Sequence, residues 1–310
     1  MLESSIRTVH FIGIGGSGMS AIAWVLLKRG YVVTGSDLGS NNQTARLAEA
    51  GATIYKGHSS ENMGTPDLVV VSTAIPIHNH ERLAAQERNI PVWQRARMLA
   101  AIMDGGKSTA IAGAHGKTTT TSMSGLLLKM AGLEPTVLVG GELNDFGGNA
   151  HVGRADLVVA EADESDGSFL LFHPDIAVVT NVEADHLDHW KNFESLKEGY
   201  AQFLRQCKPE GKIILCVDSP GAVEALERSG RAAVTYSITG QEADWQARDI
   251  QSKDGTTTFE LVHERKSHGT FQLSVPGHHN VSNALAALAV ANEHGVDPAT
   301  CRSILPAFHG

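Results

Sequence analysis

The sequence predicts an α/β protein built on two parallel sheets, and three observations support this fold class. Short apolar segments alternate with helix-patterned segments along most of the 310 residues. Two glycine-rich turns, at Gly13–Gly18 and Gly113–Gly116, each follow an apolar segment and precede a helical pattern. Glycine is also abundant, at 32 residues, which suits many tight turns between strands and helices. Strands that alternate with helices in this way form doubly wound sheets.

In the first domain, strands and helices are expected to alternate along the chain. The predicted strands are Thr8–Ile12, Tyr31–Thr34 and Leu68–Ser72. The predicted helices are Met19–Lys28, Gln43–Ala50 and Glu81–Arg88. This pattern predicts a Rossmann-like sheet over residues 1–107, with Asp104–Lys107 as the linker to the next domain.

A second α/β pattern is expected over residues 108–310. Its predicted strands are Thr109–Ala112, Thr136–Val139, Asp156–Glu161, Ile176–Thr180 and Lys212–Val217. Helical patterns cover Ser122–Met130 and the Ala-rich segment Val281–Glu293, which Gly295 would end. Residues 246–275 alternate in polarity between turn residues, which predicts a small, more antiparallel sheet.

Composition limits the classes of function. The length allows two domains, and 42% apolar residues are enough for substantial cores. A net charge of −9 argues against nonspecific nucleic-acid binding, which needs a basic face. The cysteines, Cys207, Cys216 and Cys301, lack metal-ligand spacing and suit a reducing, cytoplasmic setting. With no signal peptide and no run of about 20 apolar residues, no membrane partner is expected.

The sequence GAHGKTTT, Gly113–Thr120, is the strongest chemical signal in the chain. Between a strand and a helix, such a turn directs backbone N–H groups at phosphate oxygens. Lys117 would neutralise the outer phosphates of a nucleotide, and Thr118 would offer a hydroxyl to Mg²⁺. A complete Walker A motif has glycine where this chain has Ile111. The turn still predicts a central P-loop-type ATPase domain, in which His115 contacts phosphate or substrate or only shapes the turn.

The first glycine turn, Gly13–Gly18, fits the pattern GxGxxG, and Asp37 follows it after the next strand. This arrangement places a diphosphate at a helix N-terminus and an acid near a ribose hydroxyl. The diphosphate could belong to NAD, FAD or a UDP-sugar. In the alternative interpretation the glycines serve only a tight turn.

Acidic groups follow two further predicted strands. Four carboxylates lie within Glu161–Asp166, and acids with two histidines lie within Asn181–His189. Clustered carboxylates repel one another and need a cation, and ligands of open α/β sheets bind at the carboxyl ends of strands. These segments therefore predict a Mg²⁺–ATP site; the alternative is a solvated acidic loop. His186 and His189 could suggest zinc, but the carboxylates favour Mg²⁺, with His189 as a bystander.

Six motifs in order resemble the Mur ligases of peptidoglycan synthesis, over essentially the whole chain. They are GIGGSGMS (13–20), GSD (35–37), GAHGKTTT (113–120), EADESDGSF (161–169), TNVEADHLD (180–188) and PGHHNVSNALAA (276–287). The family uses ATP to join an amino acid to a carboxylate on a UDP-linked sugar, through an acyl phosphate. The first and fourth motifs favour the member that joins L-alanine to UDP-N-acetylmuramate over the member that recycles murein tripeptide.

The resemblance implies roles for individual residues. The implied ATP-binding residues are Gly113, Ala114, His115, Gly116, Lys117, Thr118, Thr119, His279, Asn280 and Asn283. The implied catalytic residues are Lys117, Glu161 and His186, and the implied Mg²⁺ ligands are Thr118, Glu161 and His186. The residues implied to bind UDP-N-acetylmuramate are Gly15, Gly16, Ser17, Met19, Ser20, Asp37, Ser72, Thr73, Ala74 and Arg95.

Two departures from the family pattern affect these expectations. Ala114 stands where the family usually has Thr, which removes one hydroxyl from the phosphate loop. Mur ligases also have a third, C-terminal domain that carries much of the amino-acid site, and the chain ends at Gly310, about where that domain would begin. We expect the chain alone to bind the UDP-sugar, to bind ATP weakly and to have negligible ligase activity.

Two other functions remain as alternatives. A non-catalytic UDP-sugar-binding protein would keep the first glycine turn and show no activity. An NAD-dependent oxidoreductase would use the same turn, but it leaves the GKT loop and the acidic strand ends unexplained. Oligomeric state is not indicated by the sequence.

Overall fold

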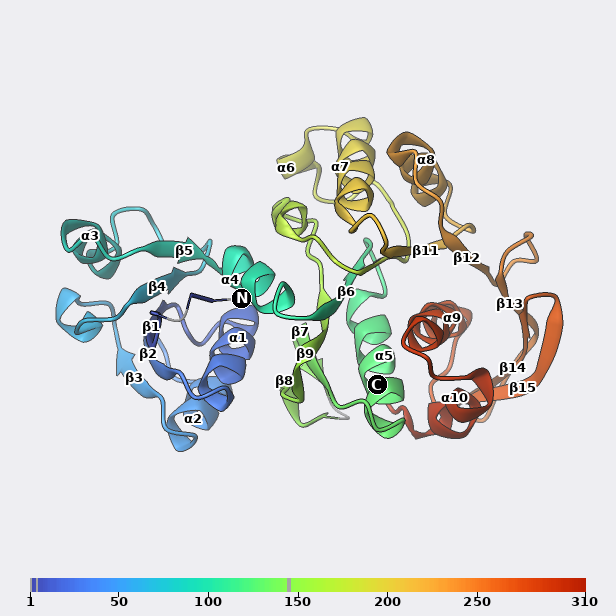
Figure 1. Cartoon of the computed structure of the whole chain (residues 1–310), viewed down its shortest axis with the longest axis horizontal. Coiled ribbons are helices and arrows are strands. Elements are labelled where there is room, and N and C mark those ends of the chain that lie inside the picture. The colour runs from blue at the N-terminus through green and yellow to red at the C-terminus, as the bar shows by residue number, and fades with distance from the viewer. Residues whose placement is uncertain (1, 4, 144–145) are drawn as a thin grey trace.

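The computed structural model describes residues 2–3, 5–143 and 146–310, which form two sheets lying side by side (Figure 1). The first sheet has five parallel strands in the order β3-β2-β1-β4-β5. These strands are β1 (Thr8–Ile12), β2 (Val32–Asp37), β3 (Thr53–Lys56), β4 (Leu68–Val71) and β5 (Val92–Gln94). The helices of this part are α1 (Ser17–Lys28), α2 (Asn42–Glu49), α3 (His80–Glu87) and α4 (Arg95–Met103).

The middle of this sheet is buried on both faces, as parallel sheets require. All four residues of β4 are buried, and β1 is buried from Val9 onward. Helices therefore cover both sides of the sheet, and the strands carry continuous apolar runs. Gly13, at φ +82°, ends β1 in the left-handed region and turns the chain into α1.

The second sheet has ten strands in the order β15-β14-β13-β12-β11-β10-β6-β9-β7-β8. Its first six strands along the chain are β6 (Lys107–Ala112), β7 (Pro135–Leu143), β8 (Gly148–His151), β9 (Arg154–Glu161), β10 (Ile176–Val179) and β11 (Lys212–Cys216). The others are β12 (Val234–Ser237), β13 (Trp245–Lys253), β14 (Thr256–His263) and β15 (Lys266–Leu273). Its helices are α5 (Lys117–Met130), α6 (Leu187–Trp190), α7 (Phe193–Gln206), α8 (Pro220–Ser229), α9 (His278–Glu293) and α10 (Pro298–Ile304).

Helices cover both faces of this sheet as well. Figure 1 shows α5 and α9 on one side and α7 and α8 on the other. The Ala-rich middle of α9 is buried from Asn283 to Ala291, where small side chains allow close packing against α5 and the sheet. The α/β fold class predicted from sequence is confirmed.

Three details differ from the sequence-based expectation. The antiparallel strands of residues 246–275 are not a separate sheet, because β13 pairs in parallel with β12 and extends the large sheet. The connection at Asp104–Lys107 is shorter than expected, since α4 ends at Met103 and β6 begins at Lys107. Helix α5 begins at Lys117 rather than near Ser122, so the phosphate-loop lysine is the first helical residue.

The two sheets meet through α1, which packs against β7 and β8. Two polar side chains, Ser20 and Asn149, are buried in this contact. Within the described ranges, none of the helices is long and apolar enough to cross a membrane.

Candidate active site at the strand ends

The phosphate loop joins β6 to α5 through two glycines in the left-handed region. Gly113 has φ +143° and Gly116 has φ +83°, conformations that disfavour other residues. A Cβ at Gly116 would also clash with the side-chain amide of Asn283. Helix α5 has no side-chain cap at Gly116, so its first N–H groups face the loop. The loop is therefore shaped to receive an anion at a helix N-terminus.

Residues after β10 hold the loop in this shape. The Asn181 side chain accepts a hydrogen bond from the backbone N of His115 at 2.9 Å and donates one to the His115 carbonyl at 2.9 Å. The Thr180 hydroxyl donates to the same carbonyl at 2.6 Å. The His115 ring is exposed and lies 3.6 Å from the Glu183 carboxylate. The backbone of His115 is thus fixed while its ring stays accessible.

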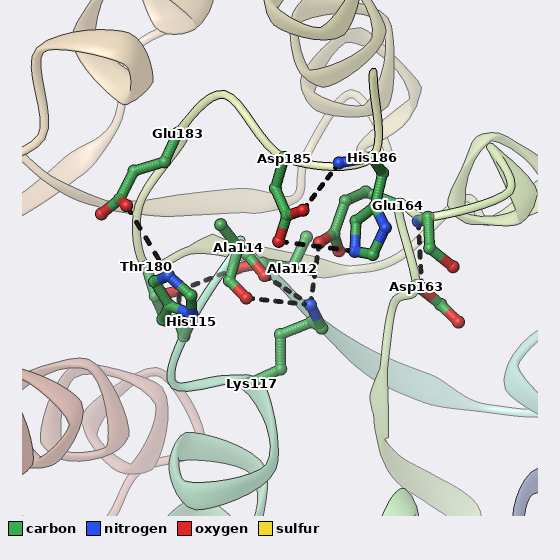
Figure 2. Close-up of polar contacts among 12 residues, drawn as sticks. Ala112, Ala114, His115, Lys117, Asp163, Glu164, Thr180, Glu183, Asp185 and His186 are labelled. Atoms are coloured by element: carbon green, nitrogen blue, oxygen red, sulfur yellow. Dashed lines mark hydrogen bonds and ion pairs between the residues drawn. The ribbon is translucent and has the colours of Figure 1, made fainter. Parts of the chain in front are cut away.

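Lys117 points from the start of α5 across the loop toward Glu164 (Figure 2). Its Nζ donates to the Gly113 carbonyl at 2.6 Å and lies 2.9 Å from Oε1 of Glu164. The Glu164 side chain is almost completely buried. Burial raises the pKa of Glu164, and the charge of Lys117 opposes that rise. The Ala114 carbonyl also accepts from Nζ, at 3.5 Å, so the ammonium group is held at the loop by three oxygen partners.

Glu161, at the end of β9, has the properties of a cation ligand. Its Oε2 accepts a hydrogen bond from the Gly140 N–H at 2.5 Å, and its Oε1 is buried without a hydrogen-bond partner among the described residues. Burial raises the pKa of Glu161, and the Thr118 hydroxyl, the Gly140 N–H and the Lys117 charge oppose this rise. A buried carboxylate oxygen without a partner beside a hydroxyl fits Mg²⁺, which prefers oxygen ligands.

His186 lies on the loop that faces Lys117 in Figure 2. It has φ +52°, and its Nε2 is 3.7 Å from Oδ2 of the neighbouring Asp185. Across residues 2–3, 5–143 and 146–310, no three His, Cys, Asp or Glu side chains are grouped to hold a metal ion. Thr118 lies close enough to Glu161 for its hydroxyl to oppose the rise in the Glu161 pKa, whereas His186 is paired with Asp185. The adjacent His189 ring packs edge-on against Trp190.

A pocket of about 900 Å³ opens beside the phosphate loop. Its walls come from the loop itself, the segments after β10, β11 and β12, and the first turn of α9. His279, Asn280 and Asn283 line it from α9, and Thr119 lines it from α5. The pocket has the size of a small-molecule site and adjoins the phosphate-binding turn. The three α9 residues therefore lie where a nucleotide bound to the loop would extend.

A smaller cavity, of about 120 Å³, lies between the two sheets. Gly18 and Arg95 line it from the first part of the chain, and Lys117, Gly140 and Glu161 line it from the second. Nη2 of Arg95 lies 3.7 Å from Oδ2 of Asp163. This junction brings the helix of the first glycine turn within one cavity of the phosphate-loop lysine.

The first glycine turn is held by the end of β2. The Ser36 carbonyl accepts hydrogen bonds from the N–H groups of Gly13, at 2.9 Å, and Ile14, at 3.1 Å. The Asp37 carboxylate accepts from Gly15 N at 2.8 Å and from Gly39 N at 3.3 Å. The Asp37 carboxylate therefore shapes this turn by binding backbone N–H groups. The sequence interpretation, in which Asp37 binds a ribose hydroxyl, did not include this role.

The predicted sugar-binding residues differ in accessibility. Gly16 and Ser17 are exposed, whereas Met19 lies in the core and Ser20 is buried against Asn149. The turn Ser72–Ala74 follows β4 beside the glycine turn, and a Cβ on Gly13 would lie 3.5 Å from the Ser72 side chain. Gly16 and Ser17 thus form the open edge of this turn, with Ser72, Thr73 and Ala74 next to it, whereas Gly15 is buried.

Three residues of the site were not found from the sequence. Glu164 was one of four acids in its segment, and nothing in the sequence singled it out as the partner of Lys117. Asn181 follows a predicted strand directly, a position that could have marked it as a loop anchor. Asn149 had no recognisable signal, because its partners are 129 and 132 residues away.

Comparison with family models assigns this fold and site to one enzyme family. Residues 8–107 match the model described as Mur ligase family, catalytic domain, and residues 111–291 match the Mur ligase middle domain. The chain belongs to the Mur ligase family.

Curated relatives extend the match over the whole chain. A protein of Anaeromyxobacter dehalogenans named UDP-N-acetylmuramate–L-alanine ligase is 46% identical over 310 residues, covering 100% of this chain and 68% of the relative. One of Pelotomaculum thermopropionicum with the same name is 46% identical, covering 98% of this chain and 66% of the relative. The chain thus spans about two thirds of the length of these relatives.

Solved structures of ligases have the same fold over nearly the whole of this chain. The UDP-N-acetylmuramate–alanine ligase of Thermotoga maritima has a TM-score of 0.86 at 29% identity, over 98% of this chain and 69% of that one. A UDP-N-acetylmuramate:L-alanyl-γ-D-glutamyl-meso-diaminopimelate ligase of Neisseria meningitides has a TM-score of 0.88 at 27% identity, over 99% of both chains.

Proposed function

We propose that this chain binds UDP-N-acetylmuramate and ATP and serves the ATP-dependent ligation of L-alanine to that sugar in peptidoglycan synthesis. The observation that carries the proposal is the cavity that Gly18 and Arg95 share with Lys117 and Glu161. A carboxylate on a sugar bound at the first glycine turn would meet the terminal phosphate of a nucleotide there. The naming of the curated relatives supports L-alanine as the amino acid.

The reaction proceeds in two displacements. An oxygen of the sugar carboxylate attacks the γ-phosphorus of ATP, the bond to the bridging oxygen breaks, and ADP leaves. The amine of L-alanine then attacks the carbonyl carbon of the acyl phosphate, the amide bond forms, and phosphate leaves with the amine proton released. Neither step needs a nucleophile from the protein, so alignment and charge carry the catalysis.

The first step brings two anions together, and residues at the junction offset their repulsion. Lys117 and the N–H groups at the start of α5 face the phosphate side of the cavity, and Arg95 faces the sugar side. Thr118 and Glu161 would hold Mg²⁺, which supplies positive charge to the phosphate oxygens when it is bound. The donor set in these two residues fits the ion, with His186 as a further ligand only after its ring turns from Asp185.

The rest of the proposal concerns organisation and location. Residues 1–107 would form the UDP-sugar-binding domain and residues 108–310 the ATP-binding domain, in a cytoplasmic enzyme. His279, Asn280 and Asn283 would contact the nucleotide from the large pocket. A non-catalytic UDP-sugar-binding protein is the second candidate, since the first glycine turn alone would suffice for it.

Isothermal titration and a trapping assay test the proposal together. We expect saturable binding of UDP-N-acetylmuramate and no binding of NAD. Adding ATP, Mg²⁺ and hydroxylamine tests the first chemical step, because hydroxylamine converts an acyl phosphate into a stable hydroxamate. Sugar binding with hydroxamate supports the ligase, whereas sugar binding without it, even when the C-terminal part of a curated relative is supplied in trans, favours the non-catalytic candidate. Binding of NAD instead of the sugar would contradict both.

A further inference from the structure

Asn149, on β8 at the edge of the large sheet, reaches into the first part of the chain. Its side chain is 2% exposed, and its amide nitrogen donates to the Ser17 carbonyl at 2.6 Å and to the Ser20 hydroxyl at 2.7 Å. Both acceptors lie in the first turn of α1, directly after the glycine turn. Because this amide is buried and donates both of its hydrogens, water cannot replace either hydrogen bond if it is lost.

A second contact connects the same turn to the candidate cation ligand. The Ser17 hydroxyl donates to the carbonyl of Gly140 on β7. The N–H of Gly140 donates in turn to Oε2 of Glu161 at 2.5 Å. One residue of β7 therefore lies between the turn that faces the sugar and the carboxylate that faces the nucleotide.

Arg46 of α2 completes this contact between the two sheets. Its Nη1 donates to the Gly147 carbonyl at 2.9 Å, and its guanidinium lies 4.0 Å from the ring centre of Trp24 on α1. A side chain at Gly148 would clash with this guanidinium. This contact holds α2, and through Trp24 also α1, against the segment that begins β8.

We propose that Asn149 is a positioning residue that holds the Ser17 turn in its sugar-binding shape and couples sugar binding to the nucleotide site through Gly140. The proposal rests on the proposed function. If the Glu161 carboxylate shifts when its free Oε1 takes a cation, the Gly140 N–H bonded to Oε2 moves with it, and the Gly140 carbonyl carries the Ser17 hydroxyl along. Asn149 keeps the rest of the turn attached, so the movement reaches the sugar site. Such coupling is reciprocal: each ligand changes the affinity of the other by the same factor.

The test compares affinities in the full chain by calorimetry. The dissociation constant of UDP-N-acetylmuramate is measured alone and with saturating Mg²⁺ and the β,γ-imido analogue of ATP. In the unaltered chain we expect the analogue to change this constant by about fivefold or more. In Asn149→Ala we expect the change to fall below about twofold, while the affinity for the analogue alone stays within about twofold.

Thr136→Val is the matched control. Thr136 is buried on the same β7 strand, and its hydroxyl donates to the Arg154 carbonyl at 2.9 Å without reaching α1. It should keep the full coupling factor, which separates loss of the Asn149 contact from general loosening of the hairpin. Ser17→Ala, at an exposed position, removes the link to Gly140 and should also lower the coupling, even if Asn149→Ala fails to fold.

The possible outcomes divide clearly. Loss of coupling in Asn149→Ala, or in Ser17→Ala where Asn149→Ala does not fold, with retention in Thr136→Val, supports the inference. Full coupling in a folded Asn149→Ala, or equal loss in Thr136→Val, overturns it. An unaltered chain that binds the sugar without any coupling overturns the inference and leaves the proposed function standing. A chain that binds no UDP-sugar overturns both.

Discussion

Replacing Lys117 with methionine should destabilise the protein in a way that depends on pH. The substitution keeps the length and apolar stem of the side chain but removes the charge 2.9 Å from Oε1 of Glu164. Glu164 is then a buried carboxylate without its cation, a change that costs about 3–5 kcal/mol when the group stays ionised. The hydrogen bond from Nζ to the Gly113 carbonyl is lost as well, at about 1 kcal/mol at every pH.

Glu164 can take up a proton in the variant, so the free-energy cost of that protonation is the upper limit of the pH-dependent loss of stability. Taking up a proton at about pH 7, starting from the ordinary glutamate pKa of 4.5, costs about 1.36 × (7 − 4.5), or about 3.4 kcal/mol. At about pH 5 the same expression gives about 0.7 kcal/mol. Since burial already raises the pKa of Glu164, its contribution to stability is fully present below the unfolded-state pKa and is lost as pH rises through the folded-state pKa. Removing Lys117 raises that pKa further, so Lys117→Met should lose most stability at neutral pH.

Urea unfolding between about pH 5 and pH 8 measures this difference, with far-ultraviolet circular dichroism as the signal. The double variant Lys117→Met/Glu164→Gln is the control, because it removes both charges. It should recover most of the pH-dependent loss and retain only the part from Gly113. A loss that is equal at both ends of the range, or a double variant as unstable as the single one, would refute the reasoning.

Three further outcomes are expected. Glu81→Gln should lower the unfolding free energy by about 2–3 kcal/mol in urea titrations, because the buried Glu81 carboxylate binds His58 at 2.9 Å and Ser36 at 2.5 Å. An unchanged urea midpoint of unfolding would contradict this expectation. Gly116→Ala should weaken binding of the ATP analogue more than tenfold, since a Cβ at φ +83° meets Asn283, and calorimetry should show the UDP-sugar still bound. Burial and the charge of Lys107 lower the pKa of His294 to about 4, so its imidazole should stay neutral down to about pH 5 in NMR titrations. The free energy of unfolding should therefore fall as the pH drops from about 6.5 toward 4. A titration midpoint of His294 near pH 6.5 would exclude this buried environment.

The sequence predicted the parts of the fold and site that depend on local backbone geometry. The glycine turns could be located because φ values such as +82° at Gly13 and +83° at Gly116 restrict the residue type at a single position. The acidic strand ends could be placed at one edge because parallel strands end together. The fold class followed from the same alternation. These features need no knowledge of which distant residues meet.

Long-range pairing explains what the sequence could not supply. Asp37 had a plausible ligand role in the motif, yet its carboxylate binds the N–H of Gly15, which only the turn geometry of two strands brings within 2.8 Å. Likewise, the strands of residues 246–275 have the alternation of a small sheet whether or not β12 pairs with β13. A local sequence pattern indicates whether a segment forms a helix or a strand. It does not indicate which other strand will pair with the edge of that strand.

The junction between the two sheets depends most on such pairing, and the proposed chemistry requires that it does. Two reacting anions arrive on different sheets, so the positive charges that bring them together must come from both. Arg95 supplies one from the first part of the chain, and Lys117 supplies the other from the second. Each already faces a carboxylate of the same acidic segment, Asp163 at 3.7 Å and Glu164 at 2.9 Å. Because that segment holds both cations, a change in its position would move the two halves of the cavity together. We therefore expect the acidic segment after β9 to serve in alignment as well as in charge.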